Sequence, residues 1–187
     1  MLILVIVMLS SCTTTKYFIN SGSRLVSVNS NIELGGVSLD EKTYSDDYVS
    51  IILNVENVSI DMKIINHYNS SIRVLWDEAA YIDNHENAHR VIHLGVKLID
   101  KEKIQVPSVI PSGAHIEDMV VPVDCIEWID GEWEIHQLDY NEFSTMELAE
   151  IELNKYKEYP QKSSNKLLLP IEVDGKKIEY TMEFVGD

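Results

Sequence analysis

Basic residues are scarce in this sequence of 187 residues. The sequence has 15 lysines and arginines and 31 aspartates and glutamates, so the formal net charge is −16 at pH 7. A surface this acidic repels the phosphates of nucleic acids and of anionic lipid headgroups, so neither is expected as a partner. The acidity also suits the solubility of an exported protein. No Asp-x-Asp-x-Asp-Gly pattern, typical of a calcium loop, is present.

Cysteine and the common catalytic motifs are also missing or nearly so. Cys12 and Cys125 are the only cysteines. Cys125 lies among apolar residues, which indicates a small buried side chain and not a nucleophile. The sequence has no Gly-x-Ser-x-Gly elbow, no phosphate-binding glycine loop and no Cys-His arrangement. These absences exclude the hydrolases and nucleotide-binding enzymes that depend on those motifs.

The N-terminus carries an export signal. Residues 2–9 form an unbroken apolar run that is too short to span a bilayer. Ser10, Ser11 and Cys12 follow, and this is the small-residue exit of a signal peptide. The segment Leu9-Ser10-Ser11-Cys12 resembles the lipobox of bacterial lipoproteins. That resemblance implies acylation of Cys12 with fatty acids such as palmitate, and two or more chains give stable anchoring.

The lipobox divides the chain into three parts. We expect a signal peptide over residues 1–11, a lipidated Cys12 with a flexible tether over 12–24, and a single domain over 25–187. Once Cys12 is lipidated, Cys125 is left alone and no internal disulfide can form. No Asp follows Cys12, so the lipoprotein sorting pattern favours an outer membrane in an organism that has one.

Short alternating runs separated by turn signals dominate the domain and predict an all-β fold. Asp174-Gly175 is a strong signal for a type I′ turn. Its register places mostly apolar pairs on one face: Val173 with Lys176, Ile171 with Ile178, Leu169 with Tyr180 and Leu167 with Met182. On the other face Glu172 lies opposite Lys177. Pro170 lacks an N–H and predicts an edge strand or a bulge at its position.

Three further turns give registers of the same kind. Asp130-Gly131 would pair Trp128 with Trp133 and Ile126 with Ile135, and would leave Glu127 opposite Glu134 on a solvated face. Glu56-Asn57 would pair Val55 with Val58, Leu53 with Ile60, Ile51 with Met62 and Val49 with Ile64. Gly35-Gly36 would pair Leu34 with Val37 and Ile32 with Leu39. Because all four registers gather apolar side chains on a common face, they predict antiparallel pairing.

The remaining elements are three strands and one helix. Strands are expected over residues 72–76, 88–98 and 116–121. Ser144 and Glu147 form a capping box, and Pro160 lies just past the end, so a short helix inserted near 144–158 is expected.

One motif points to catalysis. His85-Glu86-Asn87-Ala88-His89 matches His-Glu-x-x-His, in which two histidines bind zinc and the glutamate activates water. The motif requires a helix, because only a helix stacks positions i and i+4 toward one metal. Turn formers at Asp83, Asn84 and Asn87 and the strand-forming residues after His89 favour a turn followed by a strand. These residues make the zinc site the less favoured interpretation. A zinc hydrolase that uses His85, Glu86 and His89 is kept as the alternative function.

Three segments together resemble a known group. Residues 72–83 (IRVLWDEAAYID), 90–96 (RVIHLGV) and 107–111 (PSVIP) resemble a group of small uncharacterised bacterial lipoproteins. The resemblance implies an immunoglobulin-like antiparallel β-sandwich and brings no activity with it.

The preferred interpretation is a lipid-anchored envelope protein that acts as a binding or assembly module without catalysis and without a cofactor. The expected partners are the membrane, through the anchor on Cys12, and either another envelope protein or a glycan. Trp76, Trp128 and Trp133 could offer an aromatic platform to a glycan, although core packing is the more common use of tryptophan.

Overall fold

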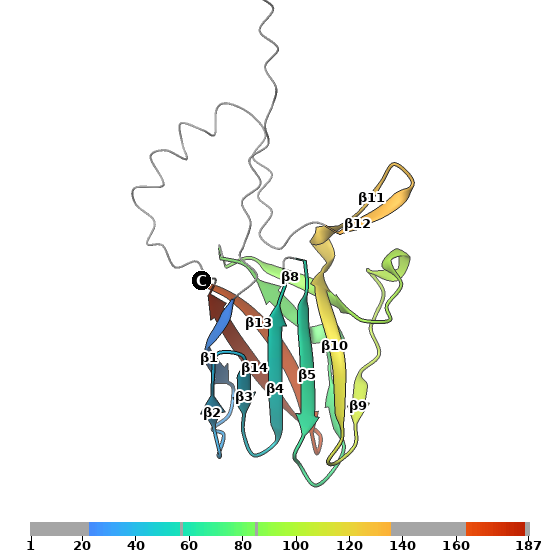
Figure 1. The fold of residues 1–187 in the computed structure, drawn as a ribbon. Coiled ribbons are helices and arrows are strands. Elements are labelled where there is room, and N and C mark those ends of the chain that lie inside the picture. Colours follow the sequence, from blue (N-terminus) through green and yellow to red (C-terminus); the bar gives the residue numbers. More distant parts are fainter. Residues whose placement is uncertain (1–22, 57, 85, 136–163, 186–187) are drawn as a thin grey trace, which may run out of the picture.

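The computed structural model describes residues 23–56, 58–84, 86–135 and 164–185 (Figure 1). Strands and turns make up nearly all of this part of the chain, and the all-β prediction is confirmed. Its helices are three single turns of 3-10 helix, η1 (Trp76–Glu78), η2 (Leu98–Asp100) and η3 (Val123–Cys125). Within these ranges no helix has the length and apolarity that a membrane crossing needs. The expected signal peptide, Cys12 and the expected helix near 144–158 lie outside the described residues.

The strands form one nearly closed antiparallel sheet and one separate hairpin. The sheet runs in the order β1-β14-β13-β7-β8-β10-β5-β4-β3-β2. Off this path, β6 pairs with β13, and β9 pairs with β6. Its two ends approach each other, since the N–H of Leu25 donates to the carbonyl of Glu41 at 2.6 Å. The strands of the sheet are β1 (Arg24–Ser30), β2 (Ser38–Leu39), β3 (Thr43–Ser45), β4 (Val49–Val55), β5 (Ile60–Asn66), β6 (Ile72–Val74), β7 (Ala80–Ile82), β8 (Ala88–His93), β9 (Ser108–Ile110), β10 (His115–Pro122), β13 (Ser164–Val173) and β14 (Lys176–Val185). The hairpin consists of β11 (Ile126–Ile129) and β12 (Glu132–Ile135) and projects beyond the end of the sheet (Figure 1).

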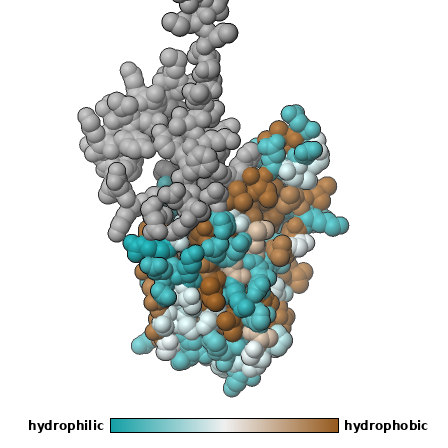
Figure 2. All heavy atoms as spheres, in the orientation of Figure 1, coloured by the Kyte–Doolittle hydropathy of each residue, from teal (hydrophilic) through white to brown (hydrophobic). Residues whose placement is uncertain are grey.

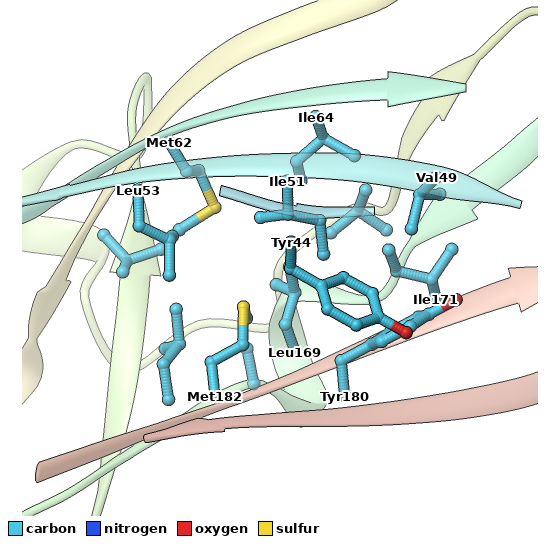
Figure 3. Packing of buried hydrophobic residues seen from close by; sticks show 14 of the residues in the cluster. Tyr44, Val49, Ile51, Leu53, Met62, Ile64, Leu169, Ile171, Tyr180 and Met182 are labelled. Atoms are coloured by element: carbon cyan, nitrogen blue, oxygen red, sulfur yellow. The ribbon is translucent and has the colours of Figure 1, made fainter. Parts of the chain in front are cut away.

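The main core lies between the two layers of the sheet. Alternate residues of β4 and β5 point toward alternate residues of β13 and β14, as the period of two requires (Figure 3). The labelled side chains that meet there are Tyr44, Val49, Ile51, Leu53, Met62, Ile64, Leu169, Ile171, Tyr180 and Met182, and all are buried. Burial of this shared apolar face stabilises the pairing of the two layers.

The buried carboxylate of Asp46 is satisfied inside this core. It accepts the Tyr44 hydroxyl at 2.9 Å and the backbone N–H groups of Tyr48 and Val49 at 2.7 and 2.8 Å. Three donors around one carboxylate offset the cost of burying its charge. Asp46 therefore fixes the tight turn between β3 and β4.

The hairpin predicted at Asp174-Gly175 is confirmed pair by pair. Leu167 lies opposite Met182, Leu169 opposite Tyr180 and Ile171 opposite Ile178. Both turn residues have positive φ, 48° at Asp174 and 74° at Gly175, as a type I′ turn requires.

The expectation of an edge strand or bulge at Pro170 was wrong. β13 is a central strand with β14 on one side and β6 and β7 on the other. The missing N–H of Pro170 costs no hydrogen bond of the sheet, because the β6–β7 side of β13 is interrupted beside Pro170. The chain leaves β6 after Val74, forms η1 and returns as β7, while the N–H of Leu75 donates to the carbonyl of Pro170 at 3.0 Å.

The β4–β5 hairpin exists, but the predicted register was wrong by two residues. Val55 pairs with Ile60 and Leu53 with Met62, where two-residue turn geometry predicted Val58 and Ile60. The N–H of Glu56 donates to the carbonyl of Ser59 at 2.9 Å and closes a longer loop. Glu56 does not have the positive φ that a type I′ turn needs, and a slip of two residues keeps every side chain on its face.

The hairpin predicted at Gly35-Gly36 was wrong. Both glycines lie outside strands, and a Cβ atom on either would collide with the carboxylate of Asp47. Because glycine has no Cβ atom, the side chain of Asp47 can lie against the backbone of both residues. The N–H of Asp47 also donates to the carbonyl of Gly35 at 3.1 Å. The hairpin in this region is β2–β3, which turns at residues 40–42.

Candidate functional site: the surface around strand β8

The predicted zinc-motif residues lie in a turn and a strand. Glu86 has φ 64°, which is left-handed, and its carboxylate pairs with Lys166 at 2.7 Å. His89 lies in β8, whose residues 88–93 are extended. His85 is outside the described residues. Across 86–93 the backbone does not form the helix that would stack histidines at i and i+4.

His89 is held between two carboxylates. Its Nδ1 lies 2.7 Å from Asp124 on η3, and its Nε2 lies 3.3 Å from Asp83. Burial lowers the pKa of His89, but the hydrogen bonds and charges of Asp124 and Asp83 together raise it above its ordinary value. The protonated ring donates to both carboxylates and so ties the β7–β8 turn to η3.

This arrangement suits a structural clamp better than a metal site. Among the described ranges, no group of three or more histidine, cysteine or acidic side chains has the geometry to hold a metal ion. Cys125, next to Asp124, is partly buried and packs against both apolar clusters. That burial agrees with the apolar role predicted for Cys125.

A second histidine on β8 is packed into the domain. The ring of His93 stacks on Trp76 with centroids 4.7 Å apart and planes 10° apart, and its Nδ1 lies 3.1 Å from Asp118. Trp76 is fully buried, and its indole N–H donates to Ser108 at 2.8 Å. Trp76 therefore belongs to the core and is not part of an exposed aromatic platform.

The strand predicted over 88–98 ends earlier, at His93. The chain then turns at Gly95 (φ 94°) and continues as an irregular segment up to β9. We call residues 94–107 the aliphatic loop. Similarly, the strand predicted over 72–76 ends at Val74 because Trp76 enters η1. The strand predicted over 116–121 is confirmed as part of β10.

Arg90 fastens the aliphatic loop to β8. Its guanidinium donates to the carbonyl of Lys101 at 2.9 Å, to the carbonyl of Lys103, and to the carboxylate of Asp77 at 2.7 Å. The Arg90 pair holds the pKa of Asp77 below its ordinary value. Five planar donors make arginine well suited to holding several acceptors in a fixed geometry.

Two further side chains of the loop point inward and complete the attachment. Gln105 is buried, donates to the carbonyl of Val91 at 2.7 Å and accepts the N–H of His93 at 3.1 Å. Lys101 donates to the carbonyls of Val123 and Ile126, at 3.2 and 2.5 Å, at the base of the β11–β12 hairpin. The loop is thus fixed in its middle, at Lys101 and Lys103, and near its C-terminal end, at Gln105.

The side chains that the loop turns outward are aliphatic. Ile99, Ile104 and Val106 are 74%, 84% and 79% exposed, and Leu94 is also exposed. Nearby, Ile92, Val121, Val123 and Ile126 form a second buried cluster. Figure 2 shows hydrophobic residues gathered where the β11–β12 hairpin joins the sheet. A well-fixed loop that exposes large aliphatic side chains is a candidate docking surface.

The β11–β12 hairpin has the register predicted for it. Trp128 pairs with Trp133, Ile126 with Ile135, and Glu127 with Glu134. The two indole rings meet edge to face with centroids 5.1 Å apart, and Trp128 is 58% exposed. Positive φ at Asp130 and Gly131 confirms the turn.

Comparison with protein-family models, with curated proteins and with solved structures gives no match. Sequence reasoning missed the aliphatic loop because its first residues continue the strand-like pattern of β8. The available signal was the pair Gly95 and Pro107, which bracket a segment with apolar residues but no regular period.

Proposed function

We propose that this chain is a lipid-anchored binding module of a bacterial cell envelope that docks another envelope protein through the aliphatic loop. The observation that carries the proposal is the contrast within that loop. Arg90, Lys101 and Gln105 fix its backbone by hydrogen bonds, while Ile99, Ile104 and Val106 face solvent. Rigid loops with exposed apolar side chains bind partners without a large ordering cost.

An immunoglobulin-like sandwich is the fold we propose for this module. Two layers of antiparallel strands around one core support it, and such domains commonly present loops at one end to a partner (Figure 1). A protein partner is favoured over a glycan because the most exposed side chains are aliphatic. Trp76, the tryptophan nearest the loop in sequence, is buried.

Site-specific photo-crosslinking tests the docking surface. A photoreactive residue at Ile104, in the full chain in native membranes, is expected to give an adduct with one envelope protein. The matched control is the same residue at Ile52, an exposed aliphatic position on β4. Ile99→Ser in the Ile104 probe chain is expected to reduce the adduct without lowering stability, because Ile99 contributes little buried area. Equal adducts from both probe positions would contradict the proposal.

The anchor is tested separately. Cys12→Ala is expected to abolish incorporation of labelled palmitate and to move the protein from the membrane fraction to the soluble fraction. A variant that stays in the membrane would contradict the anchor. Zinc analysis of the purified chain tests the alternative: stoichiometric zinc lost in His89→Ala would favour the hydrolase.

A further inference from the structure

We propose that the aliphatic loop binds a protein held in the same membrane as the lipid on Cys12. This inference rests on the proposed function, because it names the class of partner for that surface. It follows from the place where the expected tether joins the domain and from the size of the exposed surface.

The expected tether joins the domain beside the β7–β8 turn. Arg24, at the start of β1, pairs with Val185, and Val185 also pairs with Ser164 at the start of β13. Two residues further along β13, Lys166 pairs with Ile82, the last residue of β7. The start of β1 and the turn that joins β7 to β8 therefore lie at one end of the domain, which we call the tether end (Figure 1).

The aliphatic loop is fastened at the tether end. Arg90, near the start of β8, donates to the carbonyl of Lys101 at 2.9 Å. Lys101 in turn donates to the carbonyl of Val123, on η3, at 3.2 Å. The β11–β12 hairpin follows η3 and projects from this same end (Figure 1). The loop that exposes Ile99 and Ile104 thus lies on the side of the domain where the tether begins.

The length of the tether limits how far this end lies from the membrane. Eleven peptide units join Cys12 to Ser23, the first residue that the structure describes. Even a fully extended chain spans no more than about 3.6 Å per residue, so Ser23 lies within about 40 Å of the lipidated residue. A partner of the aliphatic loop must therefore present its binding surface close to the membrane.

The exposed aliphatic surface is small for a complex between freely diffusing proteins. It consists of four side chains, Leu94, Ile99, Ile104 and Val106. A stable complex of that kind usually buries about 800 Å² on each partner, which is more than four side chains supply. Two proteins held on one membrane meet at a high effective concentration, so a smaller contact is sufficient for them.

The charge of the molecule favours a protein over the lipid itself. A net charge of −16 is repelled by anionic headgroups. Two of the three lysines in the loop are engaged within the chain: Lys101 donates to backbone carbonyls, and Lys103 pairs with Asp100 at 2.9 Å. The loop therefore has little positive charge to offer to lipid phosphates.

Crosslinking in intact cells compares the anchored chain with a released one. The photoreactive residue at Ile104 is placed in the wild-type chain and in the Cys12→Ala chain, at equal amounts of protein. We expect at least about tenfold less adduct from the Cys12→Ala chain, because release from the membrane removes the effective concentration. In cells that lack this chain, the partner itself is expected to remain in the membrane fraction.

Vesicles test the geometry without a partner. The lipidated full chain is placed in vesicles of phosphatidylethanolamine and phosphatidylglycerol, with a dye at Ile104 or, as the control, at Asn69. Asn69 follows Tyr68, whose hydroxyl donates to Asp174 in the turn at the far end of β13. Ten residues of β13 separate the two ends by about 30 Å. Energy transfer to an acceptor in the headgroups is therefore expected to be at least about twofold higher from Ile104.

Three results would overturn the inference. They are equal adduct from the anchored and the Cys12→Ala chains, equal energy transfer from Ile104 and Asn69, and quenching of the Ile104 dye by brominated acyl chains, which would place the loop in the bilayer. Equal adduct from both chains would leave the docking surface of the proposed function intact and indicate a soluble partner. No adduct from either chain would refute the proposed function and this inference with it.

Discussion

At the scale of single residues, the sequence identified the histidines of β8 but not what they do. His89 was a candidate zinc ligand, and the structure places it between Asp83 and Asp124. His93 lies against Trp76 and Asp118. The carboxylates come from distant parts of the chain, and no local pattern predicts such partners.

The clamp at His89 makes stability depend on pH in a defined direction. Because the folded pKa of His89 is raised, the stabilisation is fully present below its ordinary value of 6.5 and is lost as the pH rises through the folded pKa. His89→Gln should therefore lower the free energy of unfolding more at about pH 6 than at about pH 9. The difference should be up to about 1 kcal/mol, because the ion pairs are partly exposed.

Urea unfolding of the full chain at both pH values measures this difference. His67→Gln is the matched control, because His67 contacts the hydroxyl of Ser50 and not a carboxylate. A cost of His89→Gln that is the same at both pH values would contradict the clamp.

At the scale of elements, turn residues decided which predicted hairpins were right. Asp174-Gly175 and Asp130-Gly131 adopt the positive φ angles that fix a two-residue turn, and both registers are confirmed. Glu56-Asn57 has no glycine, and the register there is shifted by two residues. Apolar alternation alone cannot detect such a shift, because the period of a strand is two.

The β13–β14 turn gives a direct test of that argument. Gly175 has φ 74°, and a Cβ atom there would meet no atom within 4 Å. Gly175→Ala should therefore destabilise the protein through backbone strain alone, by about 1 kcal/mol. Thermal or urea unfolding measures the change. Gly175→Asn should destabilise the protein less than Gly175→Ala, because asparagine tolerates the left-handed region. Equal stability of the wild-type chain and both variants would refute the left-handed conformation assigned to residue 175.

At the scale of the whole molecule, charge opposes compaction. A net charge of −16 places like charges close together on the folded surface and destabilises it through self-repulsion. Raising the salt concentration from about 0.01 M to about 0.15 M shortens the screening length from about 30 Å to about 8 Å. We therefore expect the melting temperature to rise across this range.

Calorimetry in sodium chloride measures the shift, and choline chloride at equal ionic strength is the control. General screening predicts equal shifts with the two salts. A melting temperature that does not rise would contradict the argument, and a much larger rise with sodium would indicate a specific ion site.

The sequence by itself determined the all-β character, the strand faces and two complete hairpins, because these depend on alternation and on local turn geometry. Only the tertiary structure decided how distant strands pair around β13 and why Pro170 is tolerated there. It also decided that the segment after His93 leaves the sheet as a fixed loop, since Arg90 and Gln105 hold it. These features depend on contacts between residues far apart in the chain, where any one local pattern fits several pairings that differ little in free energy.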